Sequence, residues 1–334
     1  LALSSATIPM TTNYSYDEAG RLSEKTLGPT PVSYAYNVRG WIGKIASAPF
    51  VSELRYENPR YGGAPLYSGM VSQWTWKHGQ QPENDYVFSY DGVGRLVAAK
   101  HFVDGARTDG YTERGIRYDA NGNLLAISRT AGGAVSDSLR FTLGGDVLLD
   151  VSGTSTGVFE YDPSGNLVKD GLNRLEFSYN CLNLMQTAKT ASGAQKAQFT
   201  YGSDGRKLSE KARTGGFEYM GSLIYAYRGG TLSLAQAVTD EGTIQSAGVN
   251  YFIRDHLGSV RAVVDHTGKI VERNDYYPFG GRHENASLPL TGVNRYKFGG
   301  KESLEPVSLD MLDFGARFYD PRIARWNTQD PLAE

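Results

Sequence analysis

One short stretch combines the three residue types of a hydrolytic triad. Asp255, His256 and Ser259 supply an acid, a base and a hydroxyl close together in the chain, which would suit nucleophilic catalysis if the side chains converged. They do not converge in an extended chain, because adjacent residues point to opposite faces. Together with Gly258, the same residues suit a tight turn between two strands. We therefore interpret the stretch as a turn and not as a catalytic site.

Other patterns that could hold a metal or a nucleotide are weak. The five histidines, at positions 78, 101, 256, 266 and 283, lack the paired spacing of zinc sites. Loops 162–165 and 203–205 contain aspartate and glycine without the alternating acidic ligands of calcium loops, so we interpret them as turns. Gly299-Gly300-Lys301 lacks the spaced glycines and the Ser or Thr of a phosphate loop. The sequence predicts no metal and no cofactor.

Composition favours an all-β protein. The 334 residues include 40 Gly, 22 Tyr and 13 Phe but only 21% charged residues, which is rich in turn formers and strand formers. The net charge of −2 provides no field to attract a polyanion, so nucleic acid is not an expected partner. Cys181 stands alone, which excludes an intrachain disulfide.

The chain shows no segment for membrane insertion or export. No run approaches the roughly 20 apolar residues of a membrane span, and the first residues lack the basic and apolar regions of a signal peptide. Because the sequence starts at Leu1 and stops soon after a dense motif, we expect it to be part of a longer polypeptide whose export signal lies elsewhere.

One phrase recurs along the chain: an aromatic residue (Ile116 in one copy), any residue, Tyr, Asp or Asn, two variable residues and Gly. Its five fuller copies contain Tyr16, Asp17 and Gly20; Tyr36 and Gly40; Tyr90, Asp91 and Gly94; Tyr118, Asp119 and Gly122; and Tyr161, Asp162 and Gly165. Degenerate copies start at Phe177 and Phe199.

The phrase predicts a β-hairpin. The two aromatic residues lie on one face of a strand, and Asp or Asn followed by Gly suits a type I turn with a glycine bulge. Aromatic side chains of successive hairpins would form cross-strand pairs worth about 0.2–1 kcal/mol each. The irregular spacing of the copies favours one continuous sheet over identical modules.

We place an approximate boundary near Ala247, where the recurrent phrase no longer occurs and a segment with other, closely spaced motifs begins. Residues 1–246 are expected to form the repeat sheet, with an inserted loop or extra hairpin at about 51–83. Residues 247–334 form the second part.

The recurrent phrase and the motifs of residues 247–334 together resemble the RHS-repeat or YD-repeat proteins over nearly the whole chain. The second part contains segments similar to the RHS repeat-associated core, in the expected order: YFIRDHLGSVRAVVD (251–265), NDYYPFGGR (274–282), RYKFGGKE (295–302) and LDFGARFYDPRIARWNTQDPL (312–332). The residues that mark these segments are Asp255, His256, Gly258, Tyr277, Pro278, Gly280, Gly300, Tyr319, Asp320 and Pro321.

The resemblance implies a long β-ribbon that spirals into a hollow shell, with the core segment closing one end. In bacterial members the shell commonly encloses a variable C-terminal toxic domain and releases it by self-cleavage; in the teneurins a similar shell serves adhesion. The self-cleaving members resemble aspartic proteases with a nearby Arg, and their Arg and first Asp match Arg317 and Asp330. Their second Asp has no counterpart in this chain, and Ala333 stands where they usually have Gly.

Two functions follow from this resemblance. The first is a shell segment of a secreted or surface bacterial protein that encloses its own C-terminal effector domain, with self-cleavage by Arg317 and Asp330 only in the full-length protein. The second is a cell-surface adhesin or carbohydrate-binding protein that meets glycans directly. A secretion-system component is a further expected partner. We expect no enzyme activity from this stretch alone, and an open, curved sheet with exposed edges and not a closed shell.

Overall fold

The chain is almost entirely β-structure. The computed structural model describes residues 9–284 and 294–332. In these residues 26 strands form one continuous antiparallel sheet, and four short strands form a second sheet. The expected all-β fold, a long antiparallel hairpin sheet, is confirmed.

The strands of the large sheet are β1 (Thr12–Tyr16), β2 (Leu22–Leu27), β3 (Thr30–Tyr36), β4 (Ile42–Ala46), β5 (Val51–Arg55), β6 (Gln73–Lys77), β7 (Asn84–Tyr90), β8 (Leu96–Val103), β9 (Ala106–Arg107), β10 (Glu113–Tyr118), β11 (Leu124–Ala131), β12 (Ala134–Gly144), β13 (Val147–Gly153), β14 (Gly157–Tyr161), β15 (Leu167–Asp170), β16 (Leu175–Tyr179), β17 (Met185–Thr190), β18 (Gln195–Tyr201), β19 (Lys207–Ala212), β20 (Gly215–Met220), β21 (Leu223–Arg228), β22 (Thr231–Thr239), β23 (Gly242–Gln245), β24 (Gly248–Arg254), β25 (Val260–Asp265) and β26 (Ile270–Arg273). The second sheet contains β27 (Glu302–Ser303), β28 (Leu312–Asp313), β29 (Phe318–Asp320) and β30 (Arg325–Trp326), with two 3-10 turns, η1 (Phe298–Gly300) and η2 (Glu305–Val307), in the same region.

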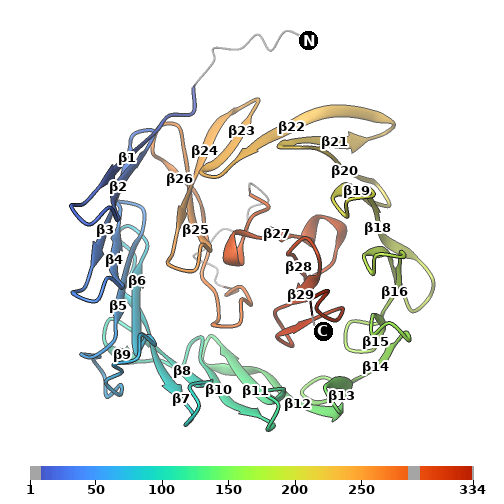
Figure 1. Ribbon diagram of the computed structural model, residues 1–334, viewed down its shortest axis with the longest axis horizontal. Helices are drawn as coiled ribbons and strands as arrows, with labels where there is room; N and C mark the ends of the chain where they lie inside the picture. The colour runs from blue at the N-terminus through green and yellow to red at the C-terminus, as the bar shows by residue number, and fades with distance from the viewer. Residues whose placement is uncertain (1–8, 285–293, 333–334) are drawn as a thin grey trace.

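The large sheet curls into a ring, which we call the wall (Figure 1). Its strands pair with their neighbours in sequence, except that β10 pairs with β8 and not with β9, which pairs with β8 alone in the described residues. The last strands, β25 and β26, lie inside the ring next to the first strands, and the second sheet lies further inside. The ribbon is therefore a spiral, in which the first strands lie outside the last strands, β25 and β26.

The recurrent phrase forms the same turn in successive hairpins. Asp91 shows the geometry: its Oδ1 accepts hydrogen bonds from the backbone N–H groups of Val93 (3.1 Å) and Arg95 (2.9 Å). Gly94 has φ +86°, a left-handed conformation that favours glycine. The register shifts between Ser89 and Tyr90, which is the bulge expected beside such a turn. Equivalent paired side-chain caps occur at Asp17, Asn37, Asp162, Asn180, Asp255 and Asp265.

Four tyrosines of the phrase join their hairpin to an earlier one. Their hydroxyl groups donate hydrogen bonds to the backbone carbonyl at the start of the earlier hairpin's return strand. The pairs are Tyr36 with Leu22, Tyr118 with Leu96, Tyr179 with Leu167 and Tyr201 with Met185, at 2.7–2.9 Å. Because each bond crosses between hairpins, the recurrent tyrosine fixes the position of one hairpin relative to another.

The apolar face of the wall points inward and is covered in two places. Leu27, Trp76 and Tyr86 of the early strands pack against Tyr251 and Val264 of β24 and β25. The inner face from β10 to β19 packs against residues 304–323 near the C-terminus. Burial of these faces stabilises the curled ribbon, because each Å² of apolar surface removed from water contributes about 25 cal/mol of free energy.

The two ends of the ring meet through side chains. Within the described residues β1 pairs only with β2 and β26 only with β25, so the hydrogen-bonded sheet is open, as expected. The backbone N–H of Thr11 donates to the hydroxyl of Tyr251 (3.1 Å), and Lys25 forms a 2.6 Å ion pair with Glu241. The spiral is thus held at its overlap by side-chain contacts in place of a β-ladder.

Two sequence boundaries fall on features of the ribbon. The division proposed at 246/247 lies in the turn between β23 and β24, and the sheet continues across it. The segment proposed as an insertion, 51–83, contains β5 and β6, which pair with each other and with their neighbours in the wall. Residues 56–72 form the loop between them.

Candidate functional site

The C-terminal residues 294–332, which we call the plug, are anchored on the inner side of the wall. Leu304, Met311, Phe318 and Ile323 of the plug are buried against wall strands. The ring of Phe318 meets that of Phe199 edge-on, with 5.2 Å between centroids. The plug is therefore part of the hydrophobic core.

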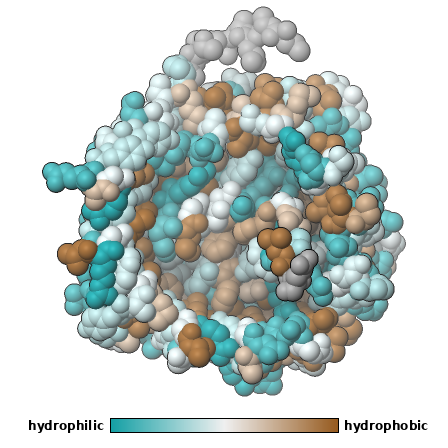
Figure 2. All heavy atoms as spheres, in the orientation of Figure 1, coloured by the Kyte–Doolittle hydropathy of each residue, from teal (hydrophilic) through white to brown (hydrophobic). Residues whose placement is uncertain are grey.

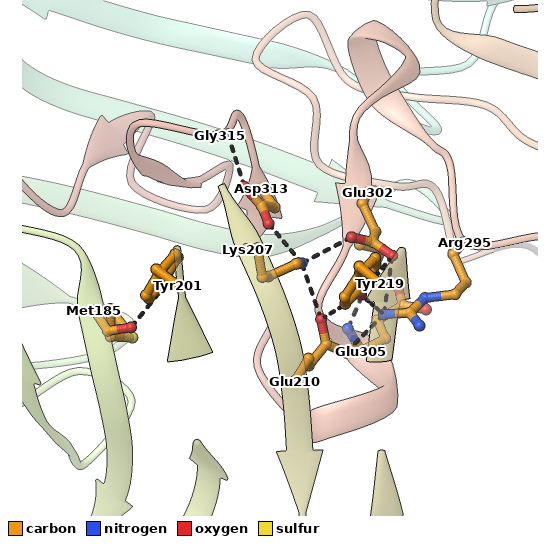
Figure 3. A network of polar contacts seen from close by, with 11 residues as sticks. Met185, Tyr201, Lys207, Glu210, Tyr219, Arg295, Glu302, Glu305, Asp313 and Gly315 are labelled. Atoms are coloured by element: carbon orange, nitrogen blue, oxygen red, sulfur yellow. Dashed lines mark hydrogen bonds and ion pairs between the residues drawn. The ribbon is translucent and has the colours of Figure 1, made fainter. Parts of the chain in front are cut away.

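A buried ionic network ties the plug to β19 and β20 (Figure 3). Lys207 contacts the carboxylates of Glu302 (2.8 Å) and Asp313 (2.6 Å) in the plug and of Glu210 (3.1 Å) in the wall. Arg295 contacts Glu210 (2.6 Å) and Glu302 (3.0 Å). Burial alone would raise the pKa of Glu302, but Lys207 and Arg295 outweigh it and hold that pKa below its usual value. The network fixes the position of the plug on the wall, because each buried charge would lose an opposite charge if the plug moved away.

A second polar joint lies on β10, β11 and β12. The Arg129 Nε donates to Glu113 (2.6 Å), while its two Nη atoms donate to the backbone carbonyls of Pro321 (3.1 Å) and Arg322 (2.5 Å). Arg322 in turn forms a 2.9 Å ion pair with Asp137. Burial raises the pKa of Glu113, an effect that Arg129 partly offsets. One buried guanidinium therefore binds both a wall carboxylate and plug backbone.

A further buried polar cluster surrounds Arg261 of β25, outside the plug. Its guanidinium is fully buried and lies 4.8 Å from the ring centre of Trp74 and 5.2 Å from that of Trp76. It contacts the carboxylates of Asp255 (3.5 Å) and Asp275, and Asp275 also lies 2.9 Å from the Nε2 of His78. Burial alone would raise the pKa of Asp275, but His78 and Arg261 outweigh it and lower that pKa strongly.

The structure brings Arg317 and Asp330 together. Their side chains form a 2.6 Å ion pair, and the Arg317 guanidinium lies 4.3 Å from the ring centre of Trp326. The other oxygen of Asp330 accepts the backbone N–H of Leu332 (3.0 Å), which makes a turn at the Asp-Pro step. The Asp330 side chain is 44% exposed, so the pair is open to solvent. The arrangement can hold one carboxylate in a fixed orientation, while aspartic-type hydrolysis requires a second.

This pair lines a cavity of about 390 Å³ between wall and plug. Asp146 and Tyr161 of the wall and Gln329 of the plug also line it. A larger cavity of about 600 Å³ lies beside the second joint and includes Tyr277, Arg282 and His283. Figure 2 shows a hollow on this side of the ring, with hydrophobic residues visible inside it.

The stretch 255–259 is a turn between β24 and β25. The N–H groups of Leu257 and Ser259 both donate to Asp255 Oδ1 (3.0 Å each), while Ser259 Oγ accepts the N–H of Gly299 (3.0 Å). His256 packs edge-on against Trp74. Acid, base and hydroxyl thus have separate structural partners.

The remaining core-motif residues lie at the plug joints. The Tyr277 N–H donates to Gly281 across a turn that contains Pro278, and Gly280, at φ +92°, lies against the ring of Phe298. Gly300 has φ +68°, and the Tyr319 hydroxyl donates to the carbonyl of Phe279 (3.0 Å). Asp320 is buried, and Pro321 presents its carbonyl to Arg129.

Sequence reasoning missed the buried charges that anchor the plug, and also the buried charge of β25. Glu113, Arg129, Lys207, Glu210 and Arg261 were not singled out. A signal existed for Arg261, which interrupts the apolar run 260–264 of a strand. Arg129 meets Glu113 across 16 residues and the carbonyl of Arg322 across 193, and Lys207 meets Glu302 across 95, so spacing along the chain gives no indication of these contacts.

Comparison with known proteins decides the family. Residues 67–333 match the sequence model of the teneurin YD-shell. The chain belongs to the teneurin YD-shell family. The YD shell is also the fold of its structural relatives: the TcdB2-TccC3-Cdc42 crystal structure has a TM-score of 0.62 at 16% identity, and the Photorhabdus luminescens Tc holotoxin pore with a TccC3 mutation has a TM-score of 0.60 at 15% identity. Each covers 96% of this chain, which spans 19% of either one.

Curated relatives of the YD shell are also much longer than this chain. Double-stranded DNA deaminase toxin A of Burkholderia cenocepacia (strain H111) is 25% identical over 289 residues, which is 73% of this chain and 19% of that protein. Salivary gland surface protein 1 of Aedes aegypti is 36% identical over 81 residues, 24% of this chain and 2% of that protein. The chain is therefore similar to about a fifth of the toxin. No helix in the described residues is long and apolar enough to cross a membrane.

Proposed function

We propose that this YD-shell segment is part of the wall of a secreted bacterial protein that encloses and delivers a C-terminal effector domain. The observation that carries the proposal is the direction of the chain: the plug is anchored on the inner face of the wall, and its strands lie within the ring (Figure 1). A polypeptide that continues from there would begin inside the wall. Similarity to a deaminase toxin supports the same role.

We further propose that Arg317 and Asp330 contribute to self-cleavage in the longer protein. Arg317 would keep the carboxylate of Asp330 oriented toward the cavity that both residues line. Asp330 would share the work of activating water with a second aspartate downstream. The geometry of the ion pair supports this role, and the exposure of Asp330 leaves room for a peptide.

The experiment is mass spectrometry of the full-length gene product after purification. We expect two polypeptides, separated shortly after residue 334, that co-purify because the effector stays enclosed. Asp330→Asn should leave a single uncut chain, while Asp310→Asn, at an exposed plug aspartate, should be cut normally. An uncut wild-type protein would contradict cleavage. An effector accessible to added protease before the shell is opened would contradict enclosure.

A further inference from the structure

Two aspartates meet where the plug touches the wall at β15 and β16. Asp320 ends β29 of the plug, and Asp170 ends β15 of the wall. Asp170 is 1% exposed and Asp320 is 6% exposed. Two carboxyl groups that are removed from water and lie close enough to interact repel if both are ionised, and the charge of Asp170 accordingly raises the pKa of Asp320.

One amide group bridges the two carboxyls. Asn173 Nδ2 donates to Asp170 Oδ2 at 2.7 Å and to Asp320 Oδ2 at 3.3 Å, so both oxygens converge on the same nitrogen. The other oxygens are already used: Asp170 Oδ1 accepts the N–H groups of Leu172 (2.9 Å) and Asn173 (3.0 Å), and Asp320 Oδ1 accepts that of Arg322 (2.7 Å). The two Oδ2 atoms are the ones left to share a proton.

The nearby arginines, Arg129 and Arg322, form their ion pairs with other carboxylates. Through space, Arg129 lowers the pKa of Asp320 and Arg322 lowers that of Asp170. Arg129 is itself paired with Glu113, and Arg322 with Asp137. The Arg322 guanidinium also donates to Ser155 (2.7 Å). Neither Asp170 nor Asp320 forms an ion pair within residues 9–284 and 294–332. Tyr319, the other titratable neighbour, donates its hydroxyl to a backbone carbonyl.

We propose that Asp170 and Asp320 share one proton in the docked state, and that this proton is required for the plug to stay fully seated on β15 and β16. The pair is a proton-dependent latch between plug and wall. It is separate from the site of Arg317 and Asp330 and does not depend on cleavage.

The direction of the pH effect follows from the raised pKa values. Burial, and then the charge of Asp170, raise the pKa of Asp320 to about 7, and burial likewise raises that of Asp170. A carboxyl whose pKa is higher in the docked state stabilises docking fully below its ordinary pKa of about 4, and this contribution is lost as the pH rises to 7. Above pH 7 the effect levels off. Opening of the plug should therefore increase by about 80-fold between pH 5 and pH 8.

Asp320→Asn is the sharpest variant. The Asn Oδ1 can accept the Arg322 N–H as before, and its Nδ2 can donate to Asp170, so the substitution imitates the protonated pair. The control is Asp91→Asn. Asp91 is a turn aspartate, and natural copies of that turn carry Asn37 and Asn180 in its place.

The measurement is hydrogen exchange of the peptide 318–327 by mass spectrometry from pH 5 to pH 8, corrected for intrinsic exchange. Wild type and Asp91→Asn should lose protection by about 80-fold, and Asp320→Asn by less than about threefold. A flat wild-type profile, or an equal slope in Asp320→Asn, would overturn the proposal. If Asp320→Asn does not fold, Asp170→Asn removes the same charge from the wall side. Carboxyl carbon NMR of the wild type decides independently: one aspartate should titrate near pH 7, and titration of all of them below pH 5 would reject the latch.

Discussion

The hydroxyl group of Tyr118 donates a 2.8 Å hydrogen bond to the backbone carbonyl of Leu96, on the preceding hairpin. Burial, the largest effect, raises the pKa of Tyr118 to about 12, which agrees with a hydroxyl that stays protonated and donates. The same bond recurs between other hairpins of the wall. The repeat tyrosine is therefore the physical link between neighbouring hairpins.

Tyr118→Phe should lower the free energy of unfolding by about 1 kcal/mol, because it removes this hydrogen bond between hairpins. The matched control is Tyr16→Phe. Tyr16 occupies the same place in the first repeat but is 63% exposed, so its substitution should change stability by less than about 0.5 kcal/mol. Urea denaturation of both variants measures the difference. Equal losses would mean that the ring alone, without its hydroxyl, links the hairpins.

The repeat hairpins could be predicted from sequence because their determinants are local. Asp91, Gly94 and Tyr90 lie within five positions of one another, and each has a backbone role that its chemistry dictates. The same argument holds for Asp255 and Ser259, whose turn follows the rule of the repeats.

The plug joints could not be predicted, because they depend on where the spiral closes. Lys207 and Glu302 are 95 residues apart, and Arg129 meets the carbonyl of Arg322 across 193 residues. Nothing in the chain near Lys207 distinguishes it from a solvated lysine of an amphipathic strand. Arg317 and Asp330, 13 residues apart, could be paired only because a family resemblance pointed to them.

Lys207→Met tests whether the ionic network holds the plug in place. Removal of the ammonium group leaves Glu210, Glu302 and Asp313 with too little positive charge, so the free energy of unfolding should fall by about 3–5 kcal/mol. The control, Lys211→Met, lies on the same strand and pairs with Glu218 at 3.1 Å, but its side chain is 39% exposed. It should cost less than about 1 kcal/mol. A small loss for Lys207→Met would show that the joint relies on apolar contacts.

Gly280→Ala tests the packing of the core motif. Gly280 has φ +92°, and a Cβ atom there would lie 2.6 Å from the ring of Phe298. Gly20 has φ +75° and nothing within 4 Å of the same position, so Gly20→Ala reports the conformational cost alone, about 1 kcal/mol. Gly280→Ala should cost at least about 1 kcal/mol more, since an overpacked contact adds to that strain. Thermal unfolding of the two variants compares them, and identical midpoints would rule out the contact.

Asp275→Asn should weaken the chain at neutral pH and make it less sensitive to acid. Asp275 has a lowered pKa in the folded chain, so its contribution to stability is present above its ordinary pKa of about 4 and is lost as the pH falls below that value. Substitution leaves Arg261 with only the 3.5 Å contact to Asp255, at an expected loss of about 3 kcal/mol at pH 7. Between pH 5 and pH 2, wild type should lose stability more steeply than Asp275→Asn, whereas the exposed control Asp310→Asn should follow wild type. Denaturant unfolding across this range measures the slopes.

The effect of Asp275 can be separated from that of Asp320 by pH. Because the pKa of Asp320 is raised and not lowered, its effect on stability has the opposite sign and lies between pH 4 and pH 7. Parallel slopes for wild type and Asp275→Asn would show that the charge of Asp275 does not stabilise the overlap of the spiral.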